Sequence, residues 1–325
     1  MLWLEGGDSK WLYYATAQLA VADVASGEVT RPARIDRWFY YPRFAPDGSI
    51  VSLVEQDRDT WLARIDPASG HVEYLTSGKR FGAGFAVSPN GRIALLEGTV
   101  DSPYELFALE DHRQLTRHNA WTKDRAAGEV RDVSFMSGDT EIHGFVTLPA
   151  GFDPAKRYPL LAYLHGGPVY QHSHEFDLAA RLYAAAGYAV IAATQPEFSL
   201  PVSRVLAISL PEYGELAWRP ADSIIYFTHG TPHEKVFDIH PYLKSLKTPI
   251  IFLNATSDKY APFGEAQSLY DAIPGAKHFY AVKASGHHFE GGEKEFYEDL
   301  DLGISLQQIA DKSDNKLKER EVARD

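Results

Sequence analysis

Hydrophobic and polar positions follow two different patterns along this chain. In the first 120 residues, short runs rich in aromatic and β-branched residues, such as Ile50–Val54 and Trp61–Ile65, are separated by polar turns. Short apolar runs between turn signals are typical of β-strands. From about residue 127, longer apolar runs alternate with segments whose apolar residues recur at helical spacing. The pattern predicts an all-β module followed by a module in which strands and helices alternate.

The all-β module contains a repeat of 43 residues. The segment Ala25–Val29 recurs as Ala68–Val72, and Ala45–Gly48 recurs as Ser88–Gly91. The second pair holds Pro-Asp-Gly and Pro-Asn-Gly, which suit tight turns because proline presets φ and glycine accepts a positive φ. A period of roughly 40 to 45 residues is typical of four-stranded propeller blades, and a closed ring needs about four to eight of them. We therefore expect a partial β-propeller of two to three blades over residues 1–125, with a small β-sandwich as the alternative.

The second module is expected over residues 126–310, and the charged tail 311–325 is expected to be solvated. A hairpin is predicted around Ser137–Asp139. The run Tyr158–Leu164 is apolar throughout, which predicts a strand buried on both faces. The alternation of strands and helices predicts an α/β fold with a doubly wound, mainly parallel sheet. The further predicted elements are strands at Tyr188–Thr194, Val205–Leu210, Pro249–Leu253 and His278–Val282 and helices at Phe176–Ala186, Ala266–Ile273 and Phe296–Ile309.

Composition narrows the range of functions. The 325 residues include 32 Lys and Arg against 44 Asp and Glu, a formal net charge of -12, which argues against nucleic acid or an anionic membrane surface as the main partner. The chain has no cysteine, so disulfides, thiolate metal sites and cysteine nucleophiles are excluded. The first residues lack the features of a signal peptide, and no window is apolar enough to span a membrane. We therefore expect a soluble, cytoplasmic protein.

Three predicted strand ends carry residues suited to hydrolytic chemistry, and ligands of open α/β sheets bind at such ends. The loop His165–Pro168 contains the adjacent glycines Gly166 and Gly167, whose backbone can turn an N–H towards an oxyanion. Asp258 follows a strand and can accept a hydrogen bond from an imidazole N–H. His287 follows the last strand and can exchange protons near neutral pH. Taken singly, each of these could instead be an ordinary turn residue.

A resemblance to a known family rests on several of these segments. Residues 131–310 resemble the catalytic domain of the prolyl oligopeptidase family of serine peptidases, nearest to its acylaminoacyl-peptidase and dipeptidyl-peptidase branches, and the blades are similar to the family's propeller. The resemblance implies an α/β-hydrolase fold, hydrolysis of short peptides or acyl-peptides through an acyl-enzyme, and no cofactor. It also implies that Asp258 orients His287 as the general base and that Gly167 helps to hold the oxyanion. The matching segments are Tyr158–Leu160, His165–Pro168, Ala186–Val190, Thr248–Pro249 and Gly286–Phe289.

The nucleophile of that family is missing from its usual sequence context. Family members carry a serine on a G-x-S-x-G turn, and no serine of this chain has glycine two positions away on both sides. A deletion is the simplest account. In one alignment Glu212 stands at the nucleophile position, and in the other, which we favour, Val205–Leu210 is the strand after an absent turn. Ser209 and Ser199 remain candidates, and the alternative for Ser209 is a strand-end hydroxyl bonded to backbone.

Other functions stay open at this point. Without a nucleophile the chain could be an inactive relative that acts as a binding or assembly module. A metal site is a further alternative, because His172–Glu175 lies in a region with several more histidines, although a His-Glu-x-x-His motif is absent from the sequence. We also expect a homo-oligomer, because the unpaired edges of an open propeller attract other strands.

Overall fold

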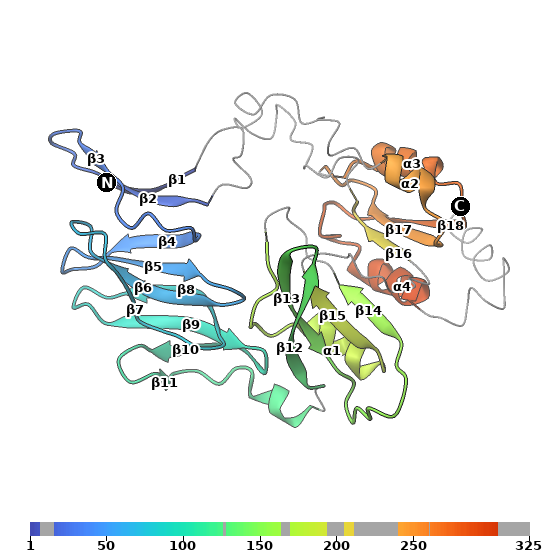
Figure 1. The fold of residues 1–325 in the computed structure, drawn as a ribbon, viewed down its shortest axis with the longest axis horizontal. Coiled ribbons are helices and arrows are strands. Elements are labelled where there is room, and N and C mark those ends of the chain that lie inside the picture. Colours follow the sequence, from blue (N-terminus) through green and yellow to red (C-terminus); the bar gives the residue numbers. More distant parts are fainter. Residues whose placement is uncertain are drawn as a thin grey trace. The chain divides into compact units, whose positions relative to one another are not determined.

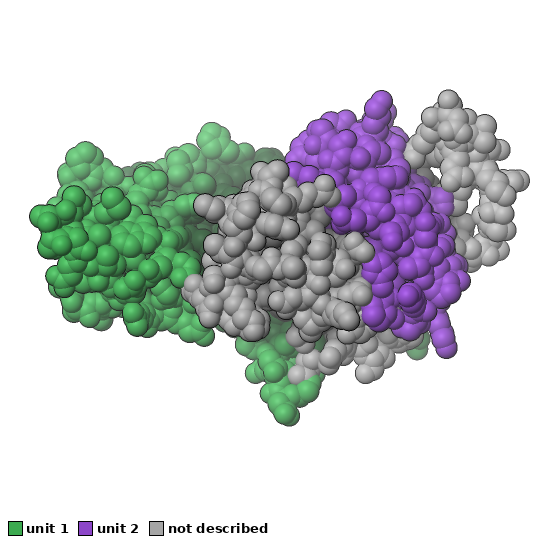
Figure 2. Space-filling model, turned by 90° about the horizontal axis from the view of Figure 1, so that it is seen from above, with its two compact units in different colours: residues 1–198 green, residues 199–325 purple. Residues whose placement is uncertain are grey.

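The computed structural model describes residues 1–6, 16–125, 128–163, 170–193, 205–210, 240–259 and 261–304. The chain divides into two compact units, residues 1–198 and residues 199–325, which Figure 2 shows in different colours. The first unit contains the N-terminal β-strands together with the first strands and helix of the β/α part. The second contains the rest of the β/α part. The charged tail 311–325 lies outside the described residues.

Antiparallel meanders make up the N-terminal part of the first unit (Figure 1). Their strands are β1 (Leu2–Glu5), β2 (Gln18–Ala22), β3 (Val29–Thr30), β4 (Phe39–Phe44), β5 (Ile50–Glu55), β6 (Thr60–Ile65), β7 (Val72–Tyr74), β8 (Phe81–Val87), β9 (Ile93–Thr99), β10 (Ser102–Ala108) and β11 (Arg113–Gln114). The first three form one meander, and β4 to β7 and β8 to β11 form two four-stranded meanders. A single parallel pair, Thr60 and Phe81, joins the two four-stranded meanders into one sheet. A 3₁₀ helix, η2 (Ala120–Asp124), follows β11.

The two four-stranded meanders reproduce the 43-residue sequence repeat. Strand β5 begins at Ile50 and β9 begins at Ile93. The turns that precede these strands contain Gly48 and Gly91, each with a φ of +82°, a backbone conformation that glycine adopts without steric cost. The repeat in the sequence is therefore a repeat of antiparallel meanders in the structure. That these meanders are blades of a partial propeller is our interpretation of this repeat.

Alternate residues of β5 enter two different hydrophobic clusters. Ile50 packs in a cluster that includes Leu19 of β2, whereas Val51 and Leu53 pack in a cluster that includes Leu95 of β9. Successive side chains of a strand point to opposite faces, so the middle meander is covered on both sides by its neighbours. Complete burial of such a side chain contributes about 1.5 to 3 kcal/mol. Packing between faces therefore explains why β5 is apolar on both sides.

The β/α part of the first unit forms one mixed sheet. Its elements are β12 (Val130–Ser137), β13 (Thr140–Thr147), β14 (Leu160–Tyr163), α1 (Leu178–Ala185) and β15 (Ala189–Ala193). The strand order is β12-β13-β15-β14, with β14 parallel to β15 and the other pairs antiparallel. The predicted hairpin is present, since Ser137 pairs with Thr140. Helix α1 begins after Asp177, whose side chain accepts a hydrogen bond from the Ala180 N–H, and the chain leaves it through Gly187 at a φ of +94°.

The prediction that Tyr158–Leu164 is buried on both faces is wrong for its described part. In the described residues, β14 pairs only with β15, so it is an edge strand of its sheet. Leu160 is 49% exposed and Tyr163 is 38% exposed. An apolar run reports that a strand is hydrophobic but does not report the position of that strand in the sheet, which decides how much of it is covered.

The second unit contains an entirely parallel sheet in its described residues. Its elements are β16 (Val205–Ile208), α2 (His240–Ser245), β17 (Ile250–Ala255), α3 (Phe263–Ala272), β18 (Lys277–Val282) and α4 (Glu293–Ile304), with strand order β16-β17-β18. Every residue of the central strand β17 is buried. Helix α3 places Ala266 and Leu269 in the interior, as the helical spacing predicts. None of the helices in the described ranges is both long enough and apolar enough to cross a membrane.

Contacts between the meanders and the first β/α elements explain why the first compact unit extends to residue 198. The Gln171 side chain donates to the backbone oxygen of Gln56 at 2.9 Å, and Arg181 on α1 is 3.0 Å from the Asp101 carboxylate. The compact units thus differ from the predicted domains 1–125 and 126–310, which describe where the fold pattern changes. Those domain boundaries are still a prediction.

Candidate active site

The parallel sheet of the second unit has three chemically suited side chains after three neighbouring strands. Strands β16, β17 and β18 run in the same direction. Ser209 follows β16 directly, Asp258 lies on the loop after β17, and His287 lies on the loop after β18. Carboxyl ends of parallel strands meet at one edge of a sheet, which is where open α/β sheets bind ligands.

The structure brings Asp258 and His287 together. Nδ1 of His287 lies 2.8 Å from Oδ2 of Asp258. The Asp258 side chain is fully buried, whereas the His287 side chain is 30% exposed. A carboxylate only accepts hydrogen bonds, so Nδ1 carries the proton, and Nε2 is the ring atom that can take up a further proton. This arrangement has the geometry of the acid–imidazole half of a catalytic triad.

The loop that carries Asp258 is fixed by its own hydrogen bonds. The second carboxylate oxygen, Oδ1, accepts from the Ala261 N–H at 3.0 Å. The Asn254 amide, at the end of β17, donates to the backbone oxygens of Ala255 and Ala261 at 3.1 and 3.0 Å. Asn254 therefore positions the loop, a role that the sequence analysis did not assign. A buried amide directly after the apolar run Ile250–Leu253 is the signal that could have found it.

The surroundings of His287 raise its pKa above the usual value. The hydrogen bond to Asp258 is the largest cause of this increase, burial acts in the opposite direction, and the negative charges of Asp258 and Glu290 add to the increase. A higher pKa makes the neutral imidazole a stronger base, which suits proton transfer from a hydroxyl near neutral pH.

The loop after β18 holds His287 in a closed turn. The N–H and hydroxyl of Ser285 both donate to the backbone oxygen of Glu290, at 2.9 and 3.0 Å. A Cβ at Gly286 would lie 2.3 Å from a carboxylate oxygen of the exposed Glu290, so a larger residue there would require this side chain to move. Phe289 is 4% exposed and packs against α4. Of the two adjacent histidines, it is the first that faces Asp258.

Ser209 has an unusual position for a serine. Its backbone has a φ of +47°, in the left-handed region that L-residues other than glycine seldom adopt, and its N–H donates to the Leu253 oxygen at 2.9 Å. The Oγ atom is buried and has no hydrogen-bond partner among the described residues, so it is not bonded to His287. The expectation of a hydroxyl bonded to backbone is therefore wrong.

Four further residues that the sequence predicts for the site lie outside the described residues: Gly166, Gly167, Ser199 and Glu212. Among the described residues, no group of three or more histidine, aspartate or glutamate side chains is arranged to hold a metal ion. His172 lies 3.2 Å through Nε2 from the backbone oxygen of Tyr163, and His174, discussed below, is held between two carboxylates.

Comparisons with known proteins give sequence relatives for part of the chain. No protein-family model matches it. A probable dipeptidyl-peptidase 5 of Emericella nidulans is 28% identical over 189 residues, which cover 53% of this chain and 26% of that protein. A dipeptidyl-peptidase 5 of Porphyromonas gingivalis is 30% identical over 189 residues, which cover 54% of this chain and 27% of that protein. The match thus spans about a quarter of the length of these curated relatives.

Solved structures with the same fold cover most of the chain. An acylaminoacyl peptidase of Pyrococcus horikoshii superposes with a TM-score of 0.76 at 16% identity, covering 95% of this chain and 61% of that chain. Dipeptidyl peptidase 4 of Porphyromonas gingivalis gives a TM-score of 0.69 at 14% identity, and the superposition covers 89% of this chain and 52% of that chain. At these identities the likeness shows the fold.

The chain shares with these solved structures a fold in which β-meanders precede a β/α part, and its β/α part carries the Asp258–His287 pair. In sequence the chain is similar to dipeptidyl-peptidases, and in fold it is similar to the solved acylaminoacyl peptidase. Both likenesses support the resemblance to the prolyl oligopeptidase family of peptidases.

Proposed function

We propose that the chain is a serine-type hydrolase that cleaves short peptides or acyl-peptides through an acyl-enzyme. The proposal depends on the hydrogen bond between Asp258 and His287. In such a mechanism a partly exposed imidazole is the base, and a buried carboxylate orients it. The names of the relatives, which include dipeptidyl-peptidase and acylaminoacyl peptidase, support peptides as the substrate class.

In the proposed reaction, a serine Oγ attacks the carbonyl carbon of the scissile bond while Nε2 of His287 takes up the hydroxyl proton. Asp258 stabilises the imidazolium that forms. Backbone N–H groups of Gly166 and Gly167 are proposed to donate to the oxyanion of the tetrahedral intermediate. The imidazolium then gives its proton to the leaving amine, and a water molecule hydrolyses the acyl-enzyme with the same histidine as base.

Ser209 is the candidate nucleophile among the described residues. It follows a strand of the sheet that carries the pair, and its backbone is left-handed. A serine on a strained turn after a strand is the usual form of such a nucleophile, although here the flanking glycines are absent.

A second candidate function is a binding or assembly module without catalysis. The observation that favours it is the missing contact between the Ser209 hydroxyl and His287. Without the nucleophile, catalysis of this type falls to about 10³ to 10⁴ over water, which the oxyanion site and substrate binding supply. In this case the chain acts by binding other molecules through its surface.

A fluorophosphonate probe distinguishes the two candidates, because it labels only a serine activated by a base. The purified chain and the variants His287→Ala and His288→Ala are treated with the probe, and the labelled peptide is identified by mass spectrometry. Labelling of one serine, lost in His287→Ala and retained in the matched control His288→Ala, is the result expected of the hydrolase. Loss of labelling in Ser209→Ala assigns the nucleophile. A chain that is not labelled, or labelling that is equal in all variants, refutes the hydrolase.

Two further properties are part of the proposal. We infer a cytoplasmic location from the absence of cysteine in the 325 residues. We also infer a homo-oligomer that pairs through open edges of a partial propeller. Support for an interaction edge comes from β4, where Tyr41 is 62% exposed and Phe44 is 46% exposed.

A further inference from the structure

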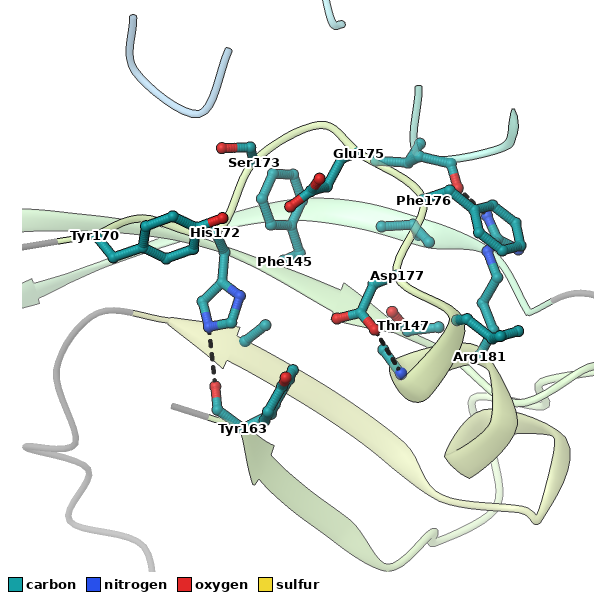
Figure 3. A pocket seen from close by; sticks show the side chains of 15 residues that line it. Phe145, Thr147, Tyr163, Tyr170, His172, Ser173, Glu175, Phe176, Asp177 and Arg181 are labelled. Carbon is teal, nitrogen blue, oxygen red and sulfur yellow. Dashed lines mark hydrogen bonds between the residues drawn. The ribbon is translucent and has the colours of Figure 1, made fainter. Parts of the chain in front are cut away.

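A cavity of about 340 Å³ lies in the first unit. Its walls come from β13 and β15, from the end of β14, and from the segment that leads into α1 (Figure 3). The volume is within the range of small-molecule sites, about 300 to 1,000 Å³. The side chains that matter below are Phe145, Tyr163, Tyr170, Glu175, Asp177 and Arg181.

Two carboxylates face this cavity, Glu175 and Asp177 (Figure 3). Tyr104 donates its hydroxyl to Glu175, and the Ala180 N–H donates to Asp177 Oδ1 at 2.9 Å. Burial is the largest cause that raises the pKa of Glu175, the Tyr104 hydrogen bond lowers it, and the charge of Asp177 raises it further. The two carboxylates thus bring negative charge to the same cavity, which favours a cation as its ligand.

The positive charge in the lining is already engaged elsewhere. The guanidinium of Arg181 donates to the backbone oxygens of Val100 and Gly128 and to the Asp101 carboxylate, and it lies 4.9 Å from the ring centre of Phe176. The side chain is only 7% exposed. Among the described lining residues, the two carboxylates thus lack a cationic partner of their own within the cavity.

Aromatic rings form much of the remaining wall. Phe145 lies behind Glu175, and Tyr163 and Tyr170 line the same cavity (Figure 3). Tyr170 is 55% exposed and Tyr163 is 38% exposed, so the cavity opens to solvent beside them. Ring faces attract cations, and their apolar surface suits the carbon skeleton of a ligand.

We propose that this cavity binds a small organic cation, a primary ammonium group carried on an aromatic or apolar body. The ammonium N–H groups would donate to Glu175 and Asp177, and the body would lie against the tyrosine and phenylalanine rings. The proposal does not depend on the hydrolase function, because none of the observations that support it involves Asp258, His287 or Ser209.

Binding of phenethylamine tests the proposal, with 2-phenylethanol as the neutral ligand of the same shape. Isothermal titration calorimetry on the full chain is expected to show one saturable site for phenethylamine and much weaker binding of the alcohol. Glu175→Gln is expected to weaken phenethylamine binding about tenfold or more, because a charge-assisted hydrogen bond is lost. The exposed Glu110→Gln is the matched control and is expected to bind like the unmodified chain.

A second variant keeps the test informative if Glu175→Gln unfolds, which circular dichroism would reveal. Asp177→Asn retains a side chain that can cap α1 while it removes the charge. Its affinity for phenethylamine is expected to fall by a similar factor. Equal binding of the amine and the alcohol, an equal loss in Glu110→Gln, or an absence of amine binding at millimolar concentration would overturn the proposal.

Discussion

Replacement of His174 by glutamine is expected to destabilise the first unit strongly at low pH and weakly at high pH. The His174 side chain is only 4% exposed and is held between two carboxylates. Nδ1 is 2.9 Å from Asp59 and Nε2 is 2.9 Å from Asp132. Carboxylates only accept, so both ring nitrogens carry protons and the ring is an imidazolium. Asp59 precedes β6 and Asp132 is on β12, so this ring joins the meanders to the β/α part.

The pH dependence follows from the pKa of His174. Burial lowers this pKa, but the hydrogen bonds and charges of Asp59 and Asp132 more than offset burial, so the net effect is an increase. A group whose pKa is raised by folding stabilises fully below its unfolded pKa, about 6.5 for histidine, and loses that contribution as the pH rises through its folded pKa. Arg58 and Lys79 also contact Asp132.

The size of the effect follows from the contacts that glutamine cannot make. Two hydrogen bonds to charged groups contribute about 1.5 to 3 kcal/mol each, and glutamine retains one weaker, neutral donation. The Asp132 side chain is 27% exposed and keeps its contacts with Arg58 and Lys79. The loss of its hydrogen bond to His174 therefore lies at the low end of that range. The expected loss in the free energy of unfolding is about 2 to 3 kcal/mol at about pH 6, and about 1 kcal/mol or less above the folded pKa.

Urea unfolding followed by tryptophan fluorescence measures this loss at both pH values. Five of the six tryptophans are in the first unit, which makes fluorescence a probe of that unit. The exposed His71→Gln is the control and is expected to change stability little. A double variant with Asp59→Asn is expected to lose less than the sum of the two single variants. The same loss at both pH values, or additive losses in the double variant, would refute the account of a charged, doubly bonded ring.

Three further predictions concern other parts of the chain. Asp258→Asn should lower the pKa of His287 towards its ordinary value, measured by NMR titration of the imidazole; an unchanged pKa would contradict the causes given above. Gly128→Ala should destabilise the fold by roughly 1 to 3 kcal/mol in urea, because its Cβ would lie 1.6 Å from the backbone oxygen of Leu148, whereas Gly84→Ala, with open space around it, serves as the control. Size-exclusion chromatography should show an oligomer, and a clean monomer would exclude pairing through open edges.

The parts of the fold that depend on local pattern could be predicted from the sequence. The repeated turns at Gly48 and Gly91, the hairpin before Thr140 and the buried face of α3 all follow from turn chemistry and periodicity. Helix α1 is shorter than the predicted Phe176–Ala186 because the side chain of Asp177 caps it. The exposure of β14 could not be predicted, because strand order is set by distant segments.

The candidate site divides in the same way. Asp258 and His287 could be expected to lie close together, since each follows a strand of a parallel sheet and such ends share an edge. The left-handed backbone and the unbonded hydroxyl of Ser209 could not be predicted, because they depend on how the chain leaves β16. The partners of His174 are also invisible in the sequence, as Asp59 is 115 residues away.

Burial and carboxylate contacts distinguish His174 from His287, the candidate base. His174 has an acceptor on each ring nitrogen and is almost fully buried, so its protons are held and the ring can only join segments. His287 has the Asp258 carboxylate on Nδ1, and its side chain is 30% exposed. That carboxylate fixes the tautomer and strengthens the imidazole as a base. We therefore propose that His287, and not His174, transfers the proton, and a His174→Gln variant that folds at neutral pH should retain any labelling by the fluorophosphonate probe.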